Sequence, residues 1–204
     1  MQSLIMYKAP DNIKKHIKPE TWKKLRDNGL GAGAELFKMV KPGMLSMLLN
    51  ISYFKSLGYD EQAGIDLHFL KRAKEDKKQV RDLEVLEDQL DMFTKLTDQE
   101  ADEMLNKTLD NIKSGEMKTA VEDLDKAWKA GDAKAIDELI RAEGEKDEAG
   151  KKMLKAMLDD RNVGMADKVV ELLREGKPAL IIVGAAHLVG DKSVAELLKK
   201  KNIE

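Results

Sequence analysis

A single histidine follows a short apolar run near the C-terminal end of the chain. Residues 179–183 read ALIIV and lead into GAAHLVG at residues 184–190. In open α/β sheets, ligands bind outside the carboxyl ends of the strands, where loops expose backbone amides. Because Gly184 lets the backbone turn or approach a ligand closely, His187 can project over such an edge. A lone histidine near a strand end usually has a structural role, so the local sequence leaves His187 open as either a structural histidine or a site residue.

An arginine lies on the apolar face of the helix predicted over residues 147–175. Arg161 comes four residues after Met157 and four before Met165, so helical spacing places its guanidinium among apolar side chains. A buried charge requires a partner, and the planar guanidinium suits bidentate pairing with a carboxylate. The sequence therefore predicts a carboxylate beside Arg161, unless the helix bends at Gly164 and the arginine extends along its stem to solvent.

Two carboxylates are candidate partners for Arg161. Glu84 directly follows residues 79–83, which we predict as a strand, just as His187 follows its own predicted strand. Parallel pairing of the two strands would bring Glu84 and His187 to the same edge of a sheet. Asp66 shares a predicted helix face with apolar side chains, so it is either half buried beside the site or an N-terminal cap.

The remaining residues with catalytic or metal-binding chemistry are few. His68 lies about 200° around its predicted helix from Asp66, and His16 lies within KKHIK, so both are expected to be solvated. The chain has no cysteine and lacks the GxSxG, HExxH and P-loop motifs, so nucleophilic catalysis has no candidate. One histidine, two carboxylates and an arginine suit metal-assisted hydrolysis or polarisation of a carbonyl. His187 would then be the metal ligand, whereas catalytic metals generally take about three protein ligands.

These side chains are positioned by a sequence with mostly helical patterns. Residues 97–100 (TDQE) form a capping box, and helical hairpins account for residues 97–145. Two strands separated by helices favour an α/β fold that is helix-rich, with a small, mostly parallel sheet and a large all-helical insertion at about residues 97–145. The expected helices span about residues 19–28, 42–58, 61–77, 97–113, 147–175 and 193–200.

Composition and charge exclude several classes of protein. The chain has 204 residues, with 36 Lys and Arg interleaved with 38 Asp and Glu, which argues against a nucleic-acid interface. Its apolar runs are far shorter than the ~20 residues that a transmembrane segment requires. The first residues form no basic leader with a cleavage site, so no export signal peptide is expected in this sequence. The length suits a single domain, 1–204.

Four blocks of the sequence together resemble the TraB/GumN family, which also includes the Tiki proteins. The blocks are LGYDEQAGIDLHFLKRAK, VRDLEVLEDQLDMFTKL, DDRNVGMADKVVELL and ALIIVGAAHLVG. The resemblance implies a split α/β core related to the erythromycin-esterase and haem-binding ChaN folds. It also implies a metal-dependent hydrolase, with Mn²⁺, Co²⁺ or Zn²⁺ as cofactor and a peptide or protein as substrate, in a family whose members are often exported.

The resemblance assigns roles to individual residues. The family's C-terminal Gly-x-x-His matches residues 184–187, so the imidazole of His187 would ligate the metal or act as the catalytic base. Six residues match the family's motifs, namely His187, Arg161 and Glu84 as catalytic residues, and Gly184, Asp66 and Asn162 as residues that bind the cofactor.

The chain also departs from the family's pattern. The family opens with a strand that ends in another Gly-x-x-His and continues with a strand bearing a glutamate, and this sequence shows neither. We therefore expect an incomplete TraB/GumN domain with half of the site, a metalloprotease-like peptide hydrolase that is inactive in this form. The alternative is a non-catalytic helical binding or assembly module that forms homo-oligomers through exposed strand edges. A third hypothesis, binding of haem or a small ligand, depends on fold analogy alone.

Overall fold

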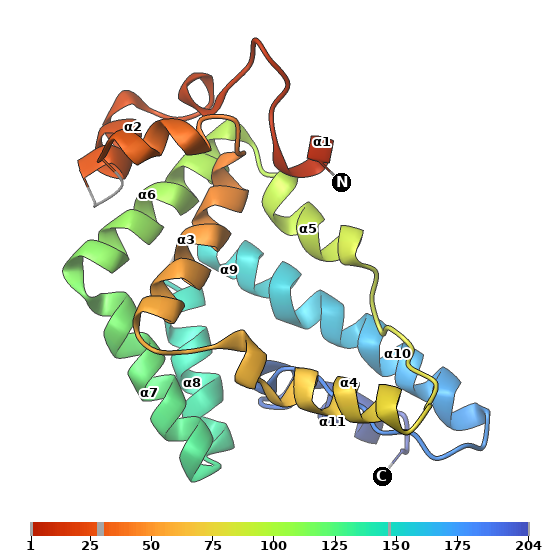
Figure 1. Ribbon diagram of the computed structural model, residues 1–204. Coiled ribbons are helices and arrows are strands. Elements are labelled where there is room, and N and C mark those ends of the chain that lie inside the picture. Colours follow the sequence, from red (N-terminus) through yellow and green to blue (C-terminus); the bar gives the residue numbers. More distant parts are fainter. Residues whose placement is uncertain (1, 28–30, 147, 204) are drawn as a thin grey trace. The chain divides into compact units, whose positions relative to one another are not determined.

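The computed structural model describes residues 2–27, 31–146 and 148–203 (Figure 1). The protein is 71% helix and 1% strand. Within the described residues, no helix combines the length and apolarity needed to cross a membrane. The chain divides into two compact units, one formed by Met1–Tyr59 and Leu86–Val121 and the other by Asp60–Val85 and Glu122–Glu204.

The first unit is built around two long helices, α3 (Pro42–Ser56) and α6 (Asp98–Ser114), which pack against each other (Figure 1). Helix α2 (Pro19–Leu25) packs on α6. Helix α5 (Leu86–Thr94) contacts both α3 and the short α1 (Gln2–Ile5). Prolines open α2 and α3 because the missing N–H costs nothing in the first turn of a helix.

Local sequence fixes where α6 begins and ends. The hydroxyl of Thr97 accepts a hydrogen bond from the backbone N–H of Glu100 at 3.3 Å, and the Glu100 carboxylate accepts one from the Thr97 N–H at 2.9 Å. The predicted capping box is thereby confirmed. Gly115 ends the helix with a φ of 82°, in the left-handed region that favours glycine. Helix α6 also contributes to the apolar core of this unit, whose buried side chains include Ile13, Leu25, Leu45, Leu105 and Leu109.

The second unit is helical as well. It contains the C-terminal part of α7 (Glu116–Ala130), with α4 (Ile65–Glu75), α8 (Ala133–Gly144), α9 (Glu148–Leu154), α10 (Asp160–Arg174) and α11 (Val194–Lys200). A single π-helical turn, Lys155–Asp159, joins α9 to α10. Helices α10 and α11 pack together over a buried apolar cluster that includes Met165, Ala166 and Val194.

The predicted sheet is absent from the part of the chain that the structure describes, so the prediction of an α/β fold with a small parallel sheet is wrong. The only β pairing in these residues is one isolated bridge between Met6 and Val40. Residues 79–83 and 179–183 have no regular secondary structure. Their apolar side chains are instead needed to cover helices, because Leu83 and Val183 pack onto the cluster of α10 and α11. Two strands without further partners would be marginally stable in any case.

The missing strands also bear on the predicted self-association. The described residues offer no strand edges through which copies of the chain could pair. The physical basis given for homo-oligomers is therefore removed, and homo-oligomerisation itself stays a prediction.

Candidate functional site

Four of the six predicted site residues, Arg161, Asn162, Glu84 and His187, meet at the start of α10, within the second unit. Helix α10 directly follows the π turn Lys155–Asp159, a wide turn of a kind often found at functional sites. Its first turn carries Arg161 and Asn162 next to each other. Arg161 binds Glu84 and Asn162 binds His187, so two neighbouring side chains hold two partners from distant parts of the chain.

The guanidinium of Arg161 and the carboxylate of Glu84 form a bidentate pair. Nε donates to Oε1 at 2.8 Å and Nη2 donates to Oε2 at 2.7 Å. A third bond runs from Nη1 to the carbonyl oxygen of Met157, in the π turn, at 3.0 Å. The two side chains are only 23% and 15% exposed, so their charge-assisted bonds are partly shielded from water. Charge burial thus predicted a carboxylate partner, and of the two candidates it is Glu84, although the described residues form no sheet edge to bring it there.

His187 lies in a single 3₁₀ turn, Ala185–His187, and is 7% exposed. Its Nδ1 lies 2.6 Å from the side-chain oxygen of Asn162. The Asn162 amide nitrogen donates to the carbonyl oxygen of Lys192 at 2.8 Å, so this amide turns its oxygen toward the ring. His187 must then donate from Nδ1, and Nε2 carries the lone pair that can accept a proton or bind a metal.

The surroundings of His187 favour the neutral imidazole. Burial lowers the pKa of His187, the positive charge of Arg161 lowers it further, and Glu84 opposes both effects in part. Because the ordinary histidine pKa is about 6.5, a lowered value leaves the ring neutral at pH 7. A neutral ring with a free Nε2 is the form that serves as a general base or as a metal ligand.

Two glycines flank His187 in different ways. Gly184 has a φ of −59°, and a Cβ there would meet only the Cδ2 of His187 at an ordinary 3.8 Å. Neither its backbone nor its surroundings therefore require glycine. Gly190 has a φ of 79°, and a Cβ there would lie 2.2 Å from Oδ1 of Asp137. The sequence analysis passed over Gly190, although Gly followed by Asp191 is a turn signal.

The other two predicted residues of the α4 region lie at the surface. Asp66 is exposed in the first turn of α4, where a carboxylate complements the helix dipole, but the N-cap is Gly64 and no side chain makes a capping hydrogen bond there. Its role in cofactor binding stays a prediction. His68 is exposed on the same helix, with its ring edge-on to Phe69.

The described residues do not form a complete metal site. Among them, no group of three His, Cys, Asp or Glu side chains is placed to hold a metal ion. His187 offers one ligand through Nε2, and both carboxylate oxygens of Glu84 accept hydrogen bonds from Arg161. A catalytic metal with about three protein ligands therefore does not fit the side chains present.

A second titratable cluster, in the first unit, was missed by the sequence analysis. His16 was expected to be solvated, but its Nδ1 lies 2.9 Å from Asp98 and its Nε2 lies 3.0 Å from Asp11. A neutral ring has one N–H, so donating to both carboxylates requires the imidazolium form. Burial disfavours that charge, but the hydrogen bonds to Asp98 and Asp11 outweigh it and hold the pKa of His16 above its ordinary value. Asp98 is 82 positions away along the chain, so no local pattern could indicate the contact.

Comparison with known families gives one match. The model of the TraB/PrgY/gumN family matches residues 1–204 of the chain. No curated protein and no solved structure matches. The family match spans both units and so includes every residue of the arrangement around α10.

Proposed function

Because the chain belongs to the TraB/PrgY/gumN family, we propose that it holds the histidine half of a hydrolytic site that acts on peptide bonds. The observation that carries the proposal is the 2.6 Å contact between His187 and Asn162, which leaves Nε2 of a neutral imidazole available. In this proposal His187 is the general base, Asn162 positions it, and Arg161 supplies positive charge beside it.

The proton moves to Nε2 of His187. When Nε2 takes a proton from the water that attacks the carbonyl carbon, the ring becomes charged and its Nδ1–H bond to Asn162 strengthens. The imidazolium then gives this proton to the leaving amine nitrogen as the C–N bond breaks. The amide oxygen of Asn162 is a neutral acceptor, so it fixes the tautomer without the strong rise in pKa that a carboxylate would cause. His187 consequently stays in its basic form at neutral pH.

Arg161 acts on the substrate carbonyl. A guanidinium has five N–H groups, and three of those in Arg161 are bound to Glu84 and Met157. The other two have no partner among the described residues and are available to the oxygen on which negative charge develops. Glu84 holds the guanidinium in one orientation, and this pre-organisation is its role in the proposal.

No step of this scheme passes through a metal. Metal binding is the more specific proposal, in which a divalent cation takes one imidazole ligand, His187. One such ligand supports weak binding only, since affinity and geometry depend on a fuller ligand set.

The test compares the wild-type chain with His187→Ala and with His68→Ala, a matched loss of an exposed histidine. Peptide hydrolysis and calorimetric titration with Mn²⁺, Co²⁺ and Zn²⁺ are measured on all three proteins. Because only the histidine half of the site is present, we expect weak metal binding and no more than slow cleavage, both lost in His187→Ala and kept in His68→Ala. If the wild type shows no cleavage and no metal binding, the proposal is refuted and the non-catalytic helical binding module is favoured.

A further inference from the structure

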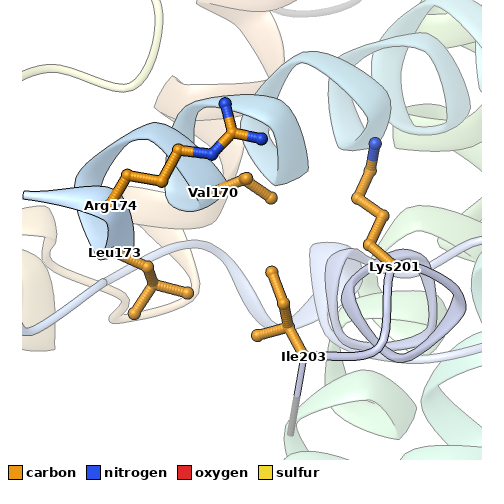
Figure 2. A pocket seen from close by; sticks show the side chains of 5 residues that line it. All are labelled: Val170, Leu173, Arg174, Lys201 and Ile203. Carbon is orange, nitrogen blue, oxygen red and sulfur yellow. The ribbon is translucent and has the colours of Figure 1, made fainter.

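The second unit has a pocket at the far end of α10 from Arg161, thirteen residues further along the helix and so roughly 20 Å away. Its volume is about 440 Å³. Figure 2 shows Val170, Leu173 and Arg174 of α10 on one side of it, and Lys201 and Ile203, which follow α11, on the other. We call this the α10–α11 pocket.

One cation of this pocket, Arg174, has no paired anion in the part of the chain that the structure describes. The acidic side chains in the last turns of α10 and just after it are already paired, Asp167 with Lys201 at 2.9 Å, Glu171 with Lys168 at 2.8 Å, and Glu175 with Arg81 at 3.0 Å. Arg174 makes no hydrogen bond or ion pair with any residue that the structure describes, and its guanidinium borders the pocket (Figure 2). The charge of Lys201 is balanced by Asp167, so among the described residues Arg174 leaves the pocket with a net positive charge.

The rest of the wall is apolar and partly fixed. Leu173 is 50% exposed and faces the gap with Val170 (Figure 2). Opposite them, Ile203 is held by the turn that ends α11, because its backbone N–H donates to the carbonyl oxygen of Leu198 at 3.1 Å. Asn202 makes this turn with a φ of 58°. Three apolar side chains thus lie beside an unpaired guanidinium.

We propose that the α10–α11 pocket binds a small amphipathic carboxylate, specifically a medium-chain alkyl monocarboxylate. The planar guanidinium of Arg174 matches a carboxylate with two parallel hydrogen bonds. The alkyl chain covers Val170, Leu173 and Ile203, which removes apolar surface from water. The volume is within the range of roughly 300 to 1,000 Å³ that is typical of small-molecule sites.

The proposal does not depend on the hydrolytic site. A competing explanation is that Arg174 and Lys201 only complement the negative ends of the helix dipoles of α10 and α11. That explanation predicts an effect of Arg174 on stability and none on ligand binding. A direct binding experiment therefore separates the two.

The experiment titrates the full chain with octanoate, followed by NMR and calorimetry, and repeats the titration with acetate and with 1-octanol. We expect saturable binding of one octanoate, with 1-octanol about tenfold weaker or more, since a hydrogen bond to a charged partner is lost. Acetate, which lacks the alkyl chain, should show no saturable binding. Arg174→Gln should weaken octanoate binding about tenfold. The control Arg72→Gln, at an arginine of α4 that lies 3.8 Å from Asp76, should bind as the wild type does.

Three results would overturn the proposal. They are no saturable binding of octanoate, equal binding of octanoate and 1-octanol, and unchanged octanoate binding in Arg174→Gln. His187→Ala should bind octanoate normally, so the failure of this proposal and the failure of the hydrolytic proposal remain distinguishable.

Discussion

The pair formed by Arg161 and Glu84 makes the sharpest quantitative prediction. The perturbation is a double-mutant cycle of Arg161→Leu, Glu84→Leu and the two together. In the single variants one charge remains in a largely shielded place without its partner, whereas the double variant replaces both charges by apolar side chains. Breaking a fully buried pair costs about 3 to 5 kcal/mol, and replacing both partners is often neutral.

The partial exposure of the two side chains reduces that cost. Arg161 and Glu84 are 23% and 15% exposed, so water stabilises the remaining charge to some extent, and we expect each single variant to lose about 2 to 3 kcal/mol. Glu84→Leu should be the costlier of the two if the third bond, from Arg161 to Met157, keeps the guanidinium in place without its carboxylate. The double variant should lie within about 1 kcal/mol of the wild type.

The same variants should change the pKa of His187 in opposite directions. Arg161 lowers this pKa and Glu84 raises it, so the value should rise in Arg161→Leu and fall in Glu84→Leu. The double variant should still lie below the ordinary histidine value, because burial, the largest cause, remains.

Two measurements follow the cycle. Hydrogen–deuterium exchange of the amides of α10 reports the free energy of opening in the second unit by itself. NMR titration of the imidazole protons gives the pKa of His187, with His187→Ala to assign the signal. If the double variant loses as much stability as the two single variants together, Arg161 and Glu84 do not interact and the described pair is refuted. A pKa of His187 that moves in the same direction in both single variants would also refute it.

Three further predictions concern the rest of the chain. His16→Gln should destabilise the first unit by about 1 kcal/mol below pH ~6.5, where the imidazolium is present in both the folded and the unfolded chain. This loss should vanish as the pH rises through the raised pKa of His16 in the folded chain. Urea unfolding at several pH values measures the difference in the free energy of unfolding. Gly190→Ala should cost more in thermal unfolding than Gly131→Ala, which has open space and should cost about 1 kcal/mol, because the added Cβ at residue 190 would also displace the Asp137 carboxylate from its hydrogen bond with Arg141. Thr97→Ala should cost about 1 kcal/mol and loosen the first turn of α6 in hydrogen exchange, with Thr119→Ala inside α7 as a control.

Helices and their ends could be predicted because their causes are local. A proline at the first position of α3, a threonine before α6 and the left-handed glycine after it each act within one turn of the backbone. The apolar stripe of α10 is equally local, since Met165 and Val169, four residues apart, are both buried.

The strands could not be predicted in the same way, because a strand exists only through its neighbours. Residues 179–183 have the apolar composition of a buried strand, but a helix surface can use the same side chains. Leu180 is largely exposed while Val183 packs on the cluster of α10 and α11, so burial along the segment is uneven. The apolar pattern of residues 179–183 therefore indicated only that part of this segment is buried. It did not indicate whether a strand or a helix packs against it.

The π turn before α10 explains why Arg161 and Asn162 are arranged differently from the prediction. The sequence pattern placed Arg161 in the middle of the apolar stripe, on a continuous helix with Met157. In the structure the turn Lys155–Asp159 widens the helix, and the buried stripe runs through Asn162 instead. Arg161 therefore lies at the margin of the stripe, where Glu84 can reach it, and Asn162 faces inward toward His187. The wider π turn thus lets two adjacent residues point to different partners. Arg161 pairs with Glu84, and Asn162 contacts His187.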